Sequence, residues 1–239
     1  MRLASFTIGS DREGESQRFK NLKNVTIDFE EQEWITLVIG WNGTGKSNVL
    51  EALATVFLEL IGKPQKKGTH SKPENPSFAY EIEYLCYGKK IRIKAEPDNS
   101  ASKYTISYHS IDQQDDITNK ENYEKISLAE FTKQRDYFLP KYIFGYYSGH
   151  SERMHDVFLP YLEKYDENLR NGINPGLRKL FYAKPVHSQF ALLAFMLNRD
   201  DFITDFLENH FGIDTEVGID SVLFVLNQPP WKSNASDGD

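Results

Sequence analysis

The stretch that decides the fold is Gly40-Trp41-Asn42-Gly43-Thr44-Gly45-Lys46-Ser47. It matches the pattern G-x-x-x-x-G-K-[ST], in which a glycine-rich loop cradles phosphate groups. At average residue frequencies the pattern occurs by chance in about one of every 100 chains of this length. Residues 34–39 before it are mostly apolar and β-branched, which is typical of a strand buried on both faces. Residues 48–60 after it repeat apolar side chains at helical spacing, so we expect a strand, a phosphate-binding loop and a helix in succession.

Each residue type in the loop suits the binding of a nucleotide. Gly40, Gly43 and Gly45 let the backbone bend tightly and approach an anion without a Cβ clash. The main-chain amides and the positive end of the following helix would face that anion. Lys46 is the predicted catalytic residue because its ammonium would reach the β- and γ-phosphates of ATP, and Ser47 is predicted to offer its hydroxyl to Mg²⁺. The loop residues predicted to bind the nucleotide are Gly40, Asn42, Gly43, Thr44, Gly45, Lys46, Ser47 and Asn48.

Outward from the loop, alternating apolar and polar residues predict an antiparallel sheet beside the nucleotide core. The strands expected in it are residues 3–8, 25–29, 78–87, 91–96 and 103–110. The intervening residues 62–77 are rich in proline and lysine and predict a loop. The fold class that follows is α/β, with a phosphate-loop NTPase core and an antiparallel side sheet.

The second half of the sequence predicts a mainly helical portion. Helices are expected at residues 127–137, 151–170, 188–197 and 201–211, and strands at residues 141–147 and 221–226. Pro160 is expected to kink or break its helix, and Asp200 or Asp201 to cap the last one. We therefore expect a nucleotide-binding lobe over residues 1–150, a helical portion over 151–227 and a disordered tail over 228–239.

The composition excludes several classes of protein. The chain has 239 residues, of which 39% are hydrophobic and 26% charged, and this argues against a mainly disordered protein. Its net charge of −7 argues against a protein that coats nucleic acid. Every apolar run falls short of the roughly 18 residues that a membrane span needs. The N-terminal residues lack a secretory signal pattern and Cys86 is the single cysteine, so a reducing cytoplasm is the expected location.

Other classes of phosphate-loop protein have weaker support. Asn119-Lys120-Glu121-Asn122 is close to the N-K-x-D sequence with which GTPases bind the base, but it ends in Asn and follows no buried strand. The arginine-rich lid of a small-molecule kinase has no clear counterpart. A self-contained kinase or GTPase stays as one alternative, and a non-catalytic module gated by nucleotide as another.

A longer block resembles one branch of ATPases. The sequence from Asn42 to Leu53 is similar to the block N-G-x-G-K-S-N-x-L-E-A-L of ABC-type ATPases of the SMC, RecF and OLD-nuclease branch. Residues 18–22 and 25–29 resemble the opening of the same branch, and Lys20 stands where the family has an arginine beside the nucleotide. The resemblance implies that Lys20 also binds the cofactor. Residues 147–153 resemble a subset of AAA/ABC ATPases from bacterial restriction and anti-phage systems.

The resemblance also identifies motifs that this sequence lacks. No glutamine stands at the family's Mg²⁺- and water-binding position, and Ser148 or His150 falls near it, so His150 is a candidate metal ligand beside Ser47. Neither the signature segment nor an apolar run ending in Asp-Glu follows. The resemblance therefore implies that the chain corresponds to the N-terminal half of such an ATPase. We expect it to bind ATP and Mg²⁺, and to hydrolyse ATP only when a C-terminal half or a homodimeric partner completes it, so the sequence leaves open whether it is an enzyme alone.

A cationic strand face raises the question of DNA. Lys90, Arg92 and Lys94 alternate with isoleucines, and the lysines of residues 63–72 would lie nearby. One interpretation is contact with a DNA backbone, in DNA-related or defence work with a nuclease partner, as the resemblance implies. The other is a solvated strand face, which alternation alone predicts.

Overall fold

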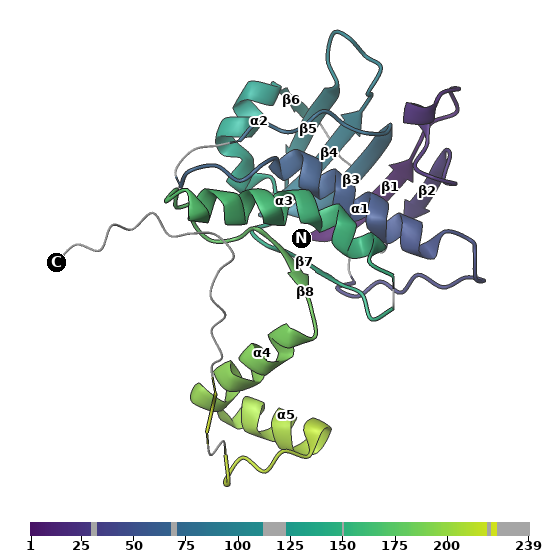
Figure 1. Cartoon of the computed structure of the whole chain (residues 1–239). Coiled ribbons are helices and arrows are strands. Elements are labelled where there is room, and N and C mark those ends of the chain that lie inside the picture. The colour runs from purple at the N-terminus through teal and green to yellow at the C-terminus, as the bar shows by residue number, and fades with distance from the viewer. Residues whose placement is uncertain (30–32, 68–70, 112–122, 150, 219–220, 224–239) are drawn as a thin grey trace, which may run out of the picture. The chain divides into compact units, whose positions relative to one another are not determined.

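The first unit of the chain, Met1–Ala183, is built on a six-stranded antiparallel sheet (Figure 1). The computed structural model describes residues 1–29, 33–67, 71–111, 123–149, 151–218 and 221–223. In chain order the strands of the sheet are β1 (Arg2–Ile8), β2 (Val25–Asp28), β3 (Tyr80–Cys86), β4 (Lys89–Ala95), β5 (Tyr104–Ser110) and β6 (Glu124–Ile126). Their spatial order is β2-β1-β3-β4-β5-β6, which confirms the predicted antiparallel sheet and adds β6 to it.

Local sequence explains the centre of this sheet. Tyr87 and Gly88 turn the chain between β3 and β4 with positive φ angles of 49° and 72°, a conformation that glycine adopts without strain. Cys86 then pairs with Lys89 across the turn. Ile91 and Ile93 on β4 are fully buried, while the residues between them are less buried, so strict alternation sets the register.

Helix α1 (Lys46–Ile61) supplies the apolar layer over one face of the sheet (Figure 1). Its side chains Ala52, Val56 and Leu60 are fully buried, and the ring of Phe57 meets that of Tyr84 on β3 at 5.7 Å between centroids. The predicted helix after the loop is thus confirmed. Because α1 packs on the sheet, it also fixes the position of the loop at the N-terminus of the helix relative to the sheet.

A smaller parallel sheet lies beside this core. Helix α2 (Leu128–Gln134), capped by Ser127, and the 3₁₀ helix η2 (Arg135–Tyr137) lead into β7 (Ile143–Tyr146). Helix α3 (Arg153–Arg170) then connects β7 to β8 (Leu180–Ala183), which pairs with it in parallel. Pro160 lies within α3, and the expected break is absent because the helix continues to Arg170.

The predicted strand at residues 34–39 is wrong in this structure. These residues have no regular secondary structure, and Ile35, Leu37 and Ile39 are 79%, 79% and 90% exposed. A strand buried on both faces needs hydrogen-bonded neighbours and a cover on each face. Within the described residues the parallel sheet holds only β7 and β8, and neither pairs with this segment. The loop–helix part of the predicted core is therefore present without its strand.

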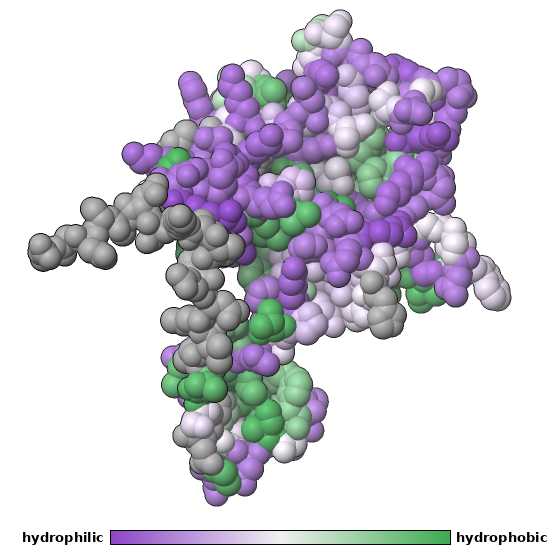
Figure 2. Space-filling model, viewed as in Figure 1, coloured by the Kyte–Doolittle hydropathy of each residue, from purple (hydrophilic) through white to green (hydrophobic). Residues whose placement is uncertain are grey.

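The second unit, Lys184–Asp239, is described through α4 (Val186–Leu197) and α5 (Asp201–Phe211). Asp200 caps α5 by accepting a 2.7 Å hydrogen bond from the Ile203 amide, as predicted. Apolar side chains gather on the surface of this unit (Figure 2). Residues 221–223 form no strand, and the rest of the expected strand and tail lie outside the described residues. The unit boundary after Ala183 differs from the division expected after residue 150, because α3 packs on α1 and β8.

Within the described ranges, no helix combines the length and the apolar character that crossing a membrane requires.

Candidate functional site

Two glycines with positive φ shape the loop before α1. Gly43 has a φ of 87° and Gly45 one of 97°. A Cβ on Gly45 would lie 3.0 Å from Cδ2 of Leu22, so both conformation and space require glycine there. Gly45 is the N-cap of α1, and its carbonyl accepts the first helical hydrogen bond, 3.0 Å from the Val49 amide. The loop therefore ends at the helix N-terminus, as the sequence predicts.

The first turn of α1 is suited to an anion. Among the described residues, no side chain caps this end of the helix, and its first turn holds no acidic residue. The first amides of a helix have no acceptor within the helix, and they carry its positive partial charge. An anion placed before Lys46 would accept hydrogen bonds from these amides.

Lys46 folds back over the loop. Its Nζ donates to the carbonyl oxygens of Gly40 and Trp41, at 2.6 and 2.8 Å, and the Thr44 hydroxyl donates to the same Trp41 carbonyl at 2.8 Å. In the described part of the chain no carboxylate forms an ion pair with Lys46. Its charge is thus held at the loop by neutral acceptors that a phosphate oxygen can replace.

A hollow of about 370 Å³ opens at this loop. Its lining residues are Asn42, Gly43, Gly45, Lys46, Ser47, Asn48 and Arg153. Six of these were predicted from the sequence. The predicted residues Gly40 and Thr44 belong to the same loop without lining the hollow. The lining holds Lys46 and Arg153 and no carboxylate. Glu51 pairs with both Arg153 and Lys20, so these three groups keep one net positive charge and the site is suited to an anionic group.

A buried carboxylate organises the polar groups behind the hollow. The Glu51 side chain is 4% exposed and forms ion pairs with Lys20 and with Arg153, whose Nη2 lies 2.8 Å from Oε1. The same Arg153 nitrogen donates to Oδ1 of Asn48 at 2.5 Å, and Asn48 donates to Oδ1 of Asn21 at 2.5 Å. Lys20 thus lies behind the hollow, held by Glu51, and is absent from the residues that line it.

Arg153 is the site residue that sequence reasoning missed. It begins α3, and α3 packs beside α1, so its guanidinium reaches the hollow from a distant part of the chain. Arg153 follows closely after the segment 147–149, but this position is only a weak signal of a site residue. A sequence pattern does not show which residues a cation at the start of a helix will contact. The contact with Asn48 and Glu51 becomes visible only in three dimensions.

Of the two residues predicted to bind the metal, Ser47 and His150, the structure describes only Ser47. Ser47 lines the hollow beside Lys46, while His150 lies outside the described residues. The described residues contain no group of three or more His, Cys, Asp and Glu that would hold a metal by itself. The Ser47 hydroxyl is an oxygen donor of the kind Mg²⁺ prefers, and it fits a metal ion that arrives with phosphate oxygens as its other ligands. The cations Lys46 and Arg153 would contact those phosphate oxygens and not the metal.

The strand face considered for DNA is neutralised by carboxylates. Lys90 lies 3.1 Å from Glu83, and Arg92 lies 2.7 Å from the same carboxylate. Lys94 approaches Glu96 at 3.6 Å. These pairs remove most of the positive charge on which a phosphate contact at this strand would depend.

A known protein family matches the part of the chain that holds this site. Residues 17–171 match the model of the AAA ATPase domain, a range that runs from before β2 to the end of α3 and includes the loop, α1 and Arg153. No curated protein matches the sequence. Because the matched range is well over half of the chain, this chain belongs to the AAA ATPase domain family.

Proposed function

We propose that this chain binds ATP together with Mg²⁺ at the loop before α1. The observation that carries the proposal is the hollow at the N-terminus of α1, where Lys46, Ser47 and Arg153 converge without a carboxylate in the lining. Membership of the AAA ATPase domain family supports nucleotide binding and ATPase activity for this region.

Each residue of the hollow has a distinct part in holding the triphosphate. The first amides of α1 would donate to phosphate oxygens, because the helix offers them no acceptor. Lys46 would exchange its contacts with the Gly40 and Trp41 carbonyls for contacts with the β- and γ-phosphates. Arg153, held in place by Glu51, would neutralise further charge, and Ser47 would supply a hydroxyl ligand to the metal. Mg²⁺ neutralises phosphate charge when it is bound.

Hydrolysis, in this proposal, requires a further segment or partner. Phosphoryl transfer needs an oriented water as well as charge neutralisation, and the sequence holds no apolar run ending in Asp-Glu that would supply the catalytic carboxylate. The exposed side chains of residues 35–39, together with Phe144 and Tyr146 on β7 at 70% and 68% exposure, are consistent with a core that another segment completes. A C-terminal ATPase half or a second copy of the chain would fill this role.

The finer assignment follows the motif resemblance. We place the chain in the SMC, RecF and OLD-like branch of these ATPases, acting in the cytoplasm in DNA-related or anti-phage work with a nuclease partner. The block from Asn42 to Leu53 supports this branch. The neutralised face of β4 does not favour a DNA contact at that strand.

Calorimetric titration with MgATP tests the proposal. We expect the wild-type chain to bind MgATP, and Lys46→Ala to lose at least about tenfold in affinity at the loop, because a charge-assisted contact contributes about 1.5–3 kcal/mol. Lys125→Ala, which removes an exposed lysine from β6, is the matched control and should bind like the wild type. Equal affinities for Lys46→Ala and the control would contradict the proposal.

A further inference from the structure

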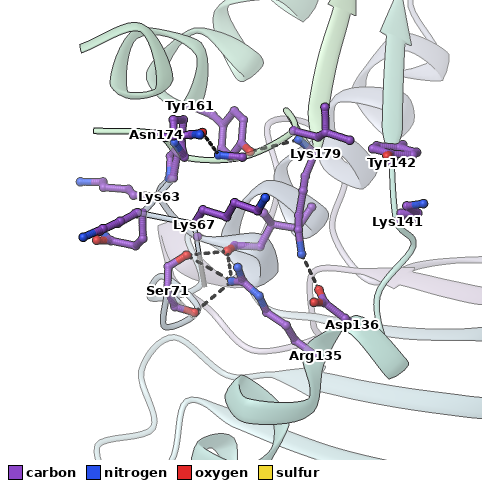
Figure 3. Close-up of a pocket in the computed structure, with 18 of the residues that line it drawn as sticks. Lys63, Lys67, Ser71, Arg135, Asp136, Lys141, Tyr142, Tyr161, Asn174 and Lys179 are labelled. Atoms are coloured by element: carbon purple, nitrogen blue, oxygen red, sulfur yellow. Dashed lines mark hydrogen bonds and ion pairs between the residues drawn. The ribbon is translucent and has the colours of Figure 1, made fainter. Parts of the chain in front are cut away.

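A second cavity lies at the far end of α1. It has a volume of about 720 Å³, within the roughly 300–1,000 Å³ typical of ligand sites. Its walls come from the loop after α1, from η2, from the residues before β7 and from the α3–β8 connection (Figure 3). The 16 residues of α1 separate it from the phosphate loop by about 24 Å at the helical rise per residue. The two cavities are therefore separate sites.

Hydrogen bonds hold the walls of this cavity together. Nδ2 of Asn168, on α3, donates to the carbonyl of Pro64 at 3.0 Å, and the side chain of Asn168 is buried. The amide of Lys67 donates to the carbonyl of Asn174 at 2.8 Å, and the Tyr161 hydroxyl accepts from the Lys179 amide at 3.2 Å. The loops that carry the cations are thus fixed at several points by the helix behind them.

Positive charge dominates the lining. The cations among the lining residues are Lys63, Lys66, Lys67, Arg135, Lys141 and Lys179, against one carboxylate, Asp136. Asp136 forms an ion pair with Lys179 (Figure 3). In the described ranges no carboxylate forms an ion pair with the four lysines at 63, 66, 67 and 141. Like charges crowded around one cavity raise its potential and attract anions.

Arg135 gives the cavity a buried positive charge. Its side chain is buried, with the residue 7% exposed, and Nη1 donates to the carbonyls of Ile61 and Ser71 at 2.6 and 3.0 Å. Its Nε has no hydrogen-bond partner, and the described carboxylates form no ion pair with it. Burial lowers the pKa of this guanidinium, because desolvation disfavours its charged form. The neighbouring carboxylate of Asp136 offsets part of this effect, and an anion in the cavity would stabilise the buried charge further.

We propose that this cavity binds the phosphate groups of a polyanionic ligand. Several lysines with separate ammonium groups suit several phosphates better than a single carboxylate, because each ammonium donates to a different oxygen. The ligand is a free polyphosphorylated molecule or the phosphates of a nucleic-acid strand, which share this chemistry. The proposal does not depend on ATP binding at the loop before α1.

The test uses inorganic tripolyphosphate as the probe, titrated by calorimetry into the full chain carrying Lys46→Ala. This background weakens the phosphate loop, so the part of the remaining binding that depends on Lys67 and Lys141 reports the second cavity. We expect binding that weakens at least tenfold when Lys67→Glu and Lys141→Glu are added. The matched control adds Lys125→Glu and Lys133→Glu, which change the net charge equally at exposed positions outside the cavity, and it should bind like the background protein.

A competition arm identifies the source of the phosphates. Displacement of a short single-stranded oligonucleotide by tripolyphosphate supports nucleic acid as the ligand. Binding of tripolyphosphate without binding of the oligonucleotide supports a free polyphosphorylated molecule. No binding in the Lys46→Ala background, or an equal loss in the cavity variant and the control variant, overturns the proposal. Loss of ATP binding in Lys46→Ala with tripolyphosphate binding retained would separate this site from the proposed ATP site.

Discussion

Replacing Glu59 with glutamine should stabilise the folded chain at alkaline pH and have a much smaller effect at acidic pH. Glu59 lies near the C-terminal end of α1 and is 5% exposed. Its Oε1 accepts a 2.9 Å hydrogen bond from the Ser77 amide, while its Oε2 has no hydrogen-bond partner. Burial raises the pKa of this carboxyl from 4.5 to about 7, with a smaller contribution from the nearby Glu74 carboxylate.

The magnitude follows from the two pKa values. Below the unfolded value both states hold the proton, so the shift costs the folded state nothing. As the pH rises toward 7 the unfolded chain releases its proton first, and the folded state loses stability relative to it. Between about pH 5 and pH 8 this loss amounts to about 2.5 kcal/mol, at 1.36 kcal/mol per pKa unit. Glutamine does not titrate, so the variant avoids this loss.

Urea unfolding of both proteins at about pH 5 and pH 8 measures the effect. We expect the difference in unfolding free energy between Glu59→Gln and the wild type to move in favour of the variant by about 2–3 kcal/mol across this interval. Glu124→Gln, which makes the same replacement at an exposed carboxylate on β6, is the matched control. A difference that stays constant with pH would refute the reasoning.

Three further predictions concern the loop and the exposed segment. Arg153→Ala should lower MgATP affinity by about tenfold in a calorimetric titration, because it removes a charge-assisted contact in the hollow, and an unchanged affinity would exclude this role. Gly45→Ala should lower the thermal stability of the chain more than Gly88→Ala does. Both glycines have positive φ angles, so alanine at either position adds a backbone strain of about 1–2 kcal/mol. Only at Gly45 does the added Cβ also meet a neighbouring atom, at 3.0 Å. Ile39→Ala should change the unfolding free energy by less than about 0.5 kcal/mol, because Ile39 is 90% exposed. Ile93→Ala should lower it by about 2–5 kcal/mol, because Ile93 is fully buried. Equal losses in the two variants would mean that residues 34–39 are packed in the folded chain.

The elements predicted well are those whose signal is local. The hairpin of β3 and β4 follows from alternation and a turn at Gly88, and α5 from its cap at Asp200. The phosphate-loop residues were identified because glycines, lysine and serine at this fixed spacing form a phosphate-binding motif. Five residues of that loop, together with Asn48 directly after it, line the hollow in the structure.

The elements predicted poorly depend on partners far away in the sequence. β8 has four residues, and its parallel pairing with β7 leaves no local pattern to detect. The segment 34–39 has the composition of a buried strand, but composition cannot show whether neighbouring strands exist to pair with it. Arg153 and the cations of the second cavity come together only through the packing of α1 and α3.

The most direct measurement of the central claim is the amide NMR spectrum of the full chain during titration with MgATP. ATP binding at the loop before α1 predicts chemical-shift changes concentrated at the amides of Gly43, Gly45, Lys46 and Ser47, and their loss in Lys46→Ala. Shifts confined to the second cavity, around Lys67 and Lys141, or no shifts at saturating MgATP, would contradict the claim.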